Sequence, residues 1–185
     1  MAAPPEKTIS NLSGKWVLER KLSTGMDDVM ALQGLSWVKV KTLAIISVTE
    51  TYRQYVDEKQ VTHVDVTPTV TGGFKGQVSS YVVDGIARTR EIAEFGEVVE
   101  SSRWSDLTDV DDEYLREGWV YAEAEKKGPK NLVLQATMDK GACVLDGVWG
   151  FIDVDGKRYH ARKTTCRKGG KTKSCCAVYS WKETV

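Results

Sequence analysis

From Leu43 onward, short runs rich in β-branched and aromatic residues alternate with turn residues. LAIISVTETYRQYV, VTHVDVTPTV and CVLDGVWGFIDVDG are three of these runs, and turn residues such as Gly or Asp lie at or just after the end of each one. About ten such runs at regular spacing are typical of an antiparallel meander, closed as a barrel or packed as a sandwich. The 185 residues suffice for one core. We therefore expect a single all-β domain over residues 1–185, with residues 1–10 as a flexible N-terminal tail.

One short helix is expected near the start of the chain. Apolar residues recur at roughly helical spacing over Met26–Leu32. Ser23 or Thr24 can cap its N-terminus, and Gly34 fits the left-handed position after its C-terminus. So short a helix needs a partner surface, which the mouth of a barrel would provide. The apolar stretch Leu43–Val48 that follows is expected to be a buried strand.

Both ends of the chain resemble a known family. GKWVLERKLSTGMDDVMALQG is similar to the opening of the calycins, and more narrowly of the intracellular fatty-acid-binding proteins, while CCAVYSWKE is similar to their last strand. The resemblance implies an antiparallel calycin-like β-barrel of about 8–10 strands with a short helical lid. Tyr179 matches the family's ligand-binding tyrosine, but Ala177 stands where the family has its partner arginine. A fatty-acid carboxylate clamp is therefore in doubt.

A second resemblance extends along the whole chain. GKWVLERKLS, ALQGLSWV, TGGFKG and SSRW together resemble small fungal lipocalin-like proteins of natural-product pathways. Relatives of this kind include cyclases that guide hetero-Diels–Alder reactions between tropolone quinone methides and a sesquiterpene. The resemblance implies a pericyclase that binds an apolar, partly oxygenated molecule in the barrel and steers its cyclisation. The alternatives are a non-catalytic intracellular carrier of a lipid or hydrophobic metabolite, and a structural β-domain that binds a protein.

Motifs for cofactors and covalent catalysis are missing from the sequence. It contains no G-x-S-x-G, and TGGFKG lacks the G-K-[ST] ending of a phosphate loop. The spacing of the four cysteines, with only His63 and His160 beside them, argues against zinc. We therefore expect neither a cofactor nor a metal. Such a reaction would depend on shape, hydrogen bonds and at most one acid or base.

The hairpin around DEKQ provides the candidate catalytic residues, which are Arg53, His63 and Asp65. If Val56 pairs with Val61, His63 and Asp65 share a face with Tyr52 and Gln54, while Arg53 and Thr51 lie on the opposite face. A polar face turned to solvent is the alternative interpretation. A change of register by one residue would exchange the two faces.

Aromatic residues supply most of the candidate ligand-binding positions. Six tryptophans in one chain could line a wide apolar pocket that stacks on flat ligands, although core packing is the simpler explanation for any one of them. The candidates are Tyr52, Gln54, Thr51, Trp104, Trp119, Tyr121, Trp149, Tyr159 and Tyr179. Arg88 and Arg90 are expected at the surface.

Charge and hydropathy restrict the partners. Basic and acidic residues balance at 26 each, which argues against nucleic acid as a partner. No apolar run is long enough for a signal peptide or a membrane span, so a cytoplasmic protein is expected. Cys166 and Cys175 could face each other across the Gly169-Gly170 turn, as reduced thiols in that compartment. The expected partner is a hydrophobic small molecule; a homodimer stays open.

Overall fold

The computed structural model describes residues 1–182, apart from the side chains of Lys127 and Lys140. Within them, ten strands form one sheet in the order β4-β3-β2-β1-β10-β9-β8-β7-β6-β5. The strands are β1 (Gly14–Leu18), β2 (Val48–Val56), β3 (Thr62–Val70), β4 (Ser79–Val83), β5 (Arg88–Ile92), β6 (Gly96–Ser105), β7 (Asn131–Met138), β8 (Cys143–Val154), β9 (Lys157–Lys168) and β10 (Lys171–Lys182). The helical segments are α1 (Met26–Gln33), α2 (Trp37–Ile45), α3 (Glu113–Arg116), η1 (Glu123–Lys127) and η2 (Asp139–Gly141).

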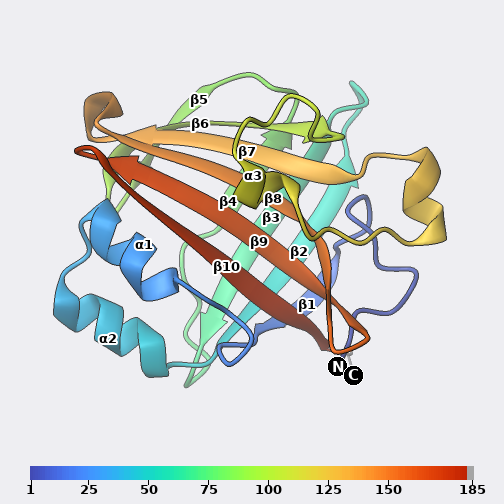
Figure 1. Ribbon diagram of the computed structural model, residues 1–185, viewed down its shortest axis with the longest axis horizontal. Helices are drawn as coiled ribbons and strands as arrows, with labels where there is room; N and C mark the ends of the chain where they lie inside the picture. The colour runs from blue at the N-terminus through green and yellow to red at the C-terminus, as the bar shows by residue number, and fades with distance from the viewer. Residues whose placement is uncertain (183–185) are drawn as a thin grey trace.

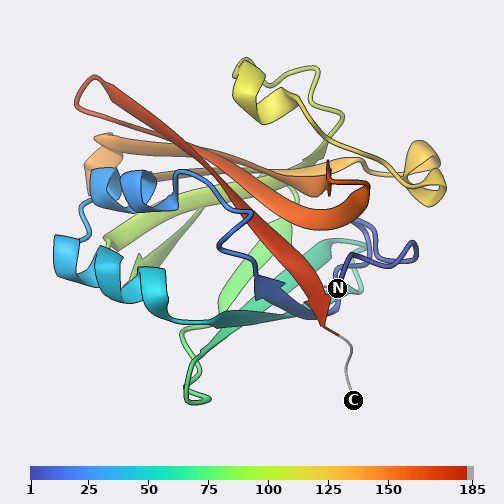
Figure 2. The same cartoon turned by 60° about the horizontal axis from the view of Figure 1, so that its bottom comes forward.

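The sheet curls into a barrel. Its neighbouring strands are antiparallel, and a single parallel bridge between Val83 of the end strand β4 and Ser102 of β6, the last strand but one, closes it. The Ser102 hydroxyl donates a hydrogen bond to the Val82 carbonyl at 2.9 Å, which holds this seam. Figures 1 and 2 show the helices α1 and α2 over one end of the barrel and the N-terminus at the other. The expected antiparallel calycin-like barrel with an N-terminal helical lid is confirmed.

The lid has two helices where the sequence predicted one. Gly25, with φ of 70°, caps α1 in place of Ser23 or Thr24, and Gly34 ends it in the expected left-handed conformation. The expected strand over Leu43–Val48 is wrong, because α2 continues to Ile45 and β2 begins only at Val48. The Ser36 side chain caps α2 by accepting a hydrogen bond from the Lys39 amide.

The other end of the barrel is plugged by side chains. Trp16 is fully buried, and its indole N–H donates to the Leu12 carbonyl at 2.8 Å. The expectation of a flexible tail over residues 1–10 is wrong, because Ile9 is fully buried and its amide donates to the carboxylate of Glu125 at 2.9 Å. Ile9 and Leu12 complete the core at this end, which fixes the segment that carries them.

The cysteines pair differently from the expectation. Cys175 is opposite Thr164 in the β9–β10 register, and the thiol nearest to Cys166 is that of Cys143, with 3.7 Å between the sulfur atoms. All four cysteines are free and buried. The expected pair of Cys166 and Cys175 is therefore wrong: because the turn consists of two residues, Gly169 and Gly170, Cys166 is opposite Lys173 across the hairpin.

Candidate functional site

The register of β2 against β3 decides which hairpin residues face the barrel interior. Val56 is opposite Thr62, one residue away from the expected pairing, and Arg53 is directly opposite Asp65. Tyr52 and Val64 are buried on the inner face, while Arg53 is exposed. Arg53, His63 and Asp65 thus share the outer face, and the expectation that at least one of them points into the cavity is wrong.

Contacts on the outer face account for these side chains. His63 stacks on Tyr55, with ring centroids 5.0 Å apart and planes 6° from parallel, and its Nε2 lies 3.0 Å from the Asp57 carboxylate. The Arg53 guanidinium lies over the Tyr55 ring, 4.8 Å from its centroid. The hydrogen bond from His63 is the main cause that lowers the pKa of Asp57. This group stabilises the surface of the hairpin.

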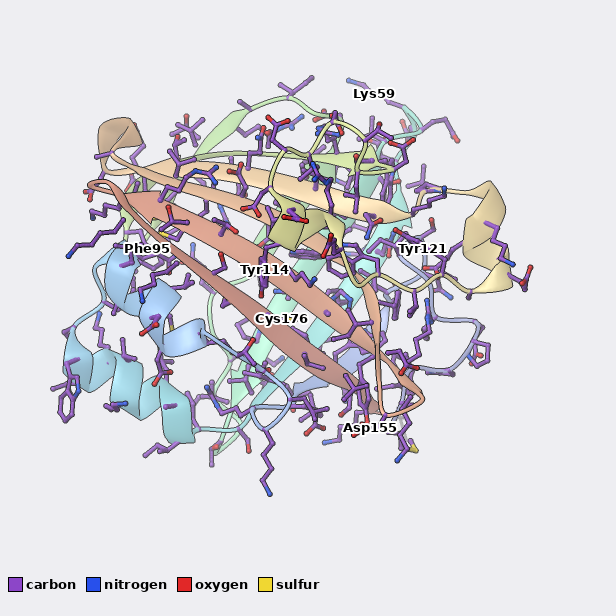
Figure 3. The ribbon with its side chains drawn as sticks, in the orientation of Figure 1. Lys59, Phe95, Tyr114, Tyr121, Asp155 and Cys176 are labelled. Carbon is purple, nitrogen blue, oxygen red and sulfur yellow. The ribbon has the colours of Figure 1, made fainter. Side chains whose placement is uncertain are left out.

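An open cavity of about 250 Å³ extends from the interior of the barrel to the lid. Gln33 of α1 and Phe95 of the β5–β6 turn border it at the lid, and Figure 3 shows Phe95 beside the end of α1. The rest of the lining comes from inward-facing residues of β4 to β9. These are Tyr81, Arg90, Ile92, Val98, Glu100, Leu134, Ala136, Met138, Leu145, Gly147, Trp149, Arg162 and Thr164.

Arg162 of β9 is a guanidinium held inside this barrel. Its Nη2 lies 2.5 Å from the Glu50 carboxylate, and the two side chains are only 15% and 12% exposed. It also donates to the Tyr52 hydroxyl, while the Tyr179 hydroxyl donates to the other Glu50 oxygen at 3.4 Å. Burial raises the pKa of Glu50 even though Arg162 acts in the opposite direction. The two side chains form a strongly polar pair in an apolar surrounding.

His160 supports Arg162 through Tyr52. Its Nδ1 donates to the Gly150 carbonyl at 2.9 Å, which leaves Nε2 as the acceptor facing the Tyr52 hydroxyl at 3.2 Å. Burial lowers the pKa of His160 to about 4, so the imidazole is neutral at physiological pH. Tyr52 is thereby fixed between Arg162, Glu50 and His160. Such a network orients the guanidinium in one direction.

Aromatic rings form the surface beside Arg162. The guanidinium carbon lies 3.9 Å from the Trp149 ring centroid and 5.0 Å from those of Tyr52 and Tyr179. Trp149 meets Tyr81 edge to face at 5.0 Å. Cation–π contacts of this kind hold a guanidinium flat against the rings. The arrangement can donate hydrogen bonds to a ligand oxygen while an aromatic surface supports the carbon skeleton.

The ligand-binding candidates divide between the two faces of the barrel wall. Trp149 lines the cavity, Tyr52 and Tyr179 contact Arg162, and Trp104 packs into the same core. Gln54 faces inward but bonds the Ile9 carbonyl and the Leu12 amide at the plugged end.

The remaining four candidates do not reach the interior. Thr51 is on the outer face of β2 beside Arg53. Trp119 and Tyr159 pack on the outside of the sheet, and Tyr121 is exposed and donates to Asn131 near η1 (Figure 3). Their expected place inside the barrel is wrong, because Trp119 and Tyr121 belong to a loop that crosses the outer surface, and Tyr159 alternates with the inward His160.

Sequence reasoning missed Glu50, His160 and Arg162. A strand alternates its faces, so Glu50 shares the face of Tyr52, and Arg162 shares that of His160. The pattern E-x-Y in β2 and H-x-R in β9 was the available signal. Arg90, which was expected at the surface, in fact lines the cavity.

Solved structures with the same architecture identify the fold. A fatty acid transporter titled REP1-NXSQ superposes with a TM-score of 0.55 and 16% identity, over 94% of this chain and 98% of its own. Fatty-acid-binding protein 1 of Echinococcus granulosus gives 0.53 and 15%, over 92% and 97%. The chain therefore has a calycin-like barrel fold.

Two curated relatives of this chain carry the name pericyclase. The probable pericyclase scpY of Mollisia scopiformis is 26% identical over 184 residues, which cover 97% of this chain and 94% of the relative. Pericyclase pydY of an Acremonium species is 26% identical over 186 aligned positions, 98% and 97% of the two chains. No protein-family model matches the chain. Among the described residues, no helix has the length and apolar character needed to cross a membrane.

Proposed function

We propose that this calycin barrel is a pericyclase that binds an apolar, partly oxygenated molecule in its cavity and guides a cycloaddition of the Diels–Alder type. Arg162 is the observation that carries the proposal. Its guanidinium lines the cavity, its Nε is buried and has no partner among the described residues, and an aromatic surface adjoins it. A carbonyl oxygen of the substrate would accept a hydrogen bond there.

A cycloaddition needs little more than this. Bonds form and break within one cyclic movement of electrons in the substrate, so the reaction itself consumes no cofactor. A charged hydrogen bond to the carbonyl withdraws electron density from the electron-poor partner and stabilises the developing charge. Trp149 and Tyr81 would hold the second partner against it in near-attack geometry. If the carbonyl belongs to the reacting π-system, the product is that of a hetero-Diels–Alder closure.

A carrier of fatty acids is the second candidate, because the solved neighbours are titled fatty-acid-binding proteins or transporters. The ion pair between Arg162 and Glu50 argues against it. A fatty-acid carboxylate would place a second negative group beside an arginine already neutralised at 2.5 Å. A neutral carbonyl meets no such repulsion, so this polar group favours an uncharged substrate.

The cellular setting is part of the proposal. The names of the two relatives support a role in fungal secondary metabolism, where cyclisations of this kind build natural products. Four free thiols support the cytoplasm as the compartment.

The test uses a substrate with a diene and an α,β-unsaturated ketone in one chain, incubated with the protein, without it, and with Arg162→Met. We expect the native protein to accelerate ring closure and to enrich one stereoisomer on chiral chromatography. Arg162→Met should lose most of the acceleration, since it removes the donor and keeps a side chain of similar length. If the protein binds the substrate but ring closure is no faster than without protein, the result would instead support the carrier.

A further inference from the structure

A second Arg–Glu pair lies inside the barrel, apart from Arg162 and Glu50. Arg90 of β5 donates to the Glu100 carboxylate at 2.8 Å, and the two side chains are 25% and 14% exposed. Both line the cavity. The Arg90 Nε is buried and has no hydrogen-bond partner among residues 1–182. Five N–H groups on a guanidinium with one acceptor leave donors that a ligand can use.

Two aromatic rings connect this pair to Arg162. The Arg90 guanidinium lies 5.6 Å from the centroid of the Tyr81 ring. The ring centroids of Tyr81 and Trp149 are 5.0 Å apart, and the Arg162 guanidinium lies 3.9 Å from the Trp149 centroid. The cavity thus has a pair of edge-to-face rings with a guanidinium at each end. A flat conjugated molecule would stack on the face of one ring and contact the edge of the other, with its ends near the two arginines.

Arg90 also lies between the inner cavity and a second pocket. Tyr81, Arg90 and Glu100 line both the inner cavity and a second space of about 350 Å³ between β4 and β5. The inner cavity of about 250 Å³ falls below the ~300–1,000 Å³ that ordinary ligand sites occupy. A substrate of ordinary size therefore extends past Arg90 into the second space.

We propose that Arg90 is a second polar anchor of the site, and that the ligand is a flat, conjugated, uncharged molecule with a carbonyl oxygen near each end. This inference rests on the proposed function, because it assigns the substrate class of the same cavity. Each arginine already has its own carboxylate, so an anionic ligand would add an unpaired charge to an apolar interior. Neutral carbonyl oxygens accept from both guanidinium groups without this cost.

The test compares two probes, biphenyl with one para-acetyl group and biphenyl with an acetyl group in each para position. Binding is followed by quenching of tryptophan fluorescence, with Arg90→Met, Arg162→Met and the matched control Arg103→Met. Arg103 is also ion-paired, with Asp109, but on the outer side of β6. We expect the diacetyl probe to bind the native protein about tenfold more tightly than the monoacetyl probe.

Arg90→Met should abolish this advantage and leave the monoacetyl affinity within about twofold, while Arg103→Met retains the advantage. The inference is overturned if Arg90→Met retains it, if the native protein shows no preference, or if neither probe binds. The assay needs no turnover, so a chain that binds the diacetyl probe through Arg90 but cyclises nothing would contradict the proposed function alone.

A second variant is expected to bind a probe more tightly than the native protein, a result that poor folding of the variant could not produce. Glu100→Gln removes the carboxylate that neutralises Arg90 and keeps the shape of the side chain. It should tighten binding of a biphenyl with one acetyl and one carboxylate group by about tenfold over the native protein. No gain would show that Arg90 cannot reach the ligand, which would contradict the inference.

Discussion

Arg162 lies directly opposite Ala177 in the antiparallel pair of β9 and β10. Paired residues project to the same face, so the guanidinium enters the barrel from the strand beside the one where the fatty-acid-binding family places its clamp arginine. The cation expected from that resemblance is present, but it comes from a different strand and is already paired with Glu50 at 2.5 Å.

The first prediction concerns the stability of variants in which the arginine is transferred from position 162 to position 177. Arg162→Ala leaves the Glu50 carboxylate buried without its cationic partner and should lower the free energy of unfolding by about 3–5 kcal/mol. Adding Ala177→Arg should recover part of that loss, because the new side chain starts from the neighbouring position on the same face. Urea unfolding measures both. Ala177→Arg alone should destabilise by placing two guanidinium groups together, and a double variant no more stable than Arg162→Ala would refute the prediction.

The outer face of the β2–β3 hairpin provides the second prediction. Arg53→Ala, His63→Ala and Asp65→Ala should each retain the native rate and stereoselectivity of cyclisation, since these side chains point away from the cavity. The chiral product assay measures both quantities, with Arg162→Met as the inactive comparison. A loss of about tenfold or more in a well-folded member of this trio would return the catalytic site to the hairpin.

The buried imidazole of His160 makes the third prediction, which concerns pH. Burial lowers its pKa from 6.5 to about 4, so the unfolded chain binds the proton more readily between these values. Stability from this group is complete above pH 6.5 and is lost as the pH falls toward 4, by on the order of 3 kcal/mol. Glu50, with a raised pKa, acts in the opposite direction.

His160→Gln isolates the effect of the histidine. The difference in unfolding free energy between the native protein and this variant should shrink steadily from pH 7 to pH 4. A difference that stays constant over that range would mean that the imidazole titrates alike in the folded and unfolded chains.

The fourth prediction concerns the outer wall at Gly150. A Cβ added there would lie 2.5 Å from the Asn131 amide nitrogen and 2.7 Å from the Trp119 ring. Gly150→Ala should cost about 1–3 kcal/mol by overpacking and shift the fluorescence of Trp119. Gly128→Ala is the control, because no atom lies within 4 Å of its added Cβ and the backbone there needs no glycine. Equal stability of the two variants would contradict the packing described.

Local patterns predicted much of the architecture. The runs of alternating residues predicted the strands from β3 onward, and Gly34 and Gly169-Gly170 marked a helix end and a hairpin turn where the structure has them. Helix α2 was missed because WVKVKT has the composition of a strand, although Ser36 provided a cap. Competing local preferences of this kind are resolved by packing.

The site was harder to predict because its residues come from separate strands. Glu50, Arg162 and Ala177 belong to β2, β9 and β10, and their contacts depend on the register of each strand against its neighbour. A shift of one residue reverses the face of a whole strand, which is why His63 and Asp65, expected on the face of Tyr52, share the outer face with Arg53.

The sequence by itself determined the class of the fold and the apolar character of its interior. It did so because alternation, turn residues and caps act over a few neighbouring residues. Only the tertiary structure decided that Arg162 faces the interior with Glu50, and that Tyr81 and Trp149 link it to Arg90. Long-range pairing of strands sets these contacts, and its free energy comes from burying the whole core rather than from any local signal.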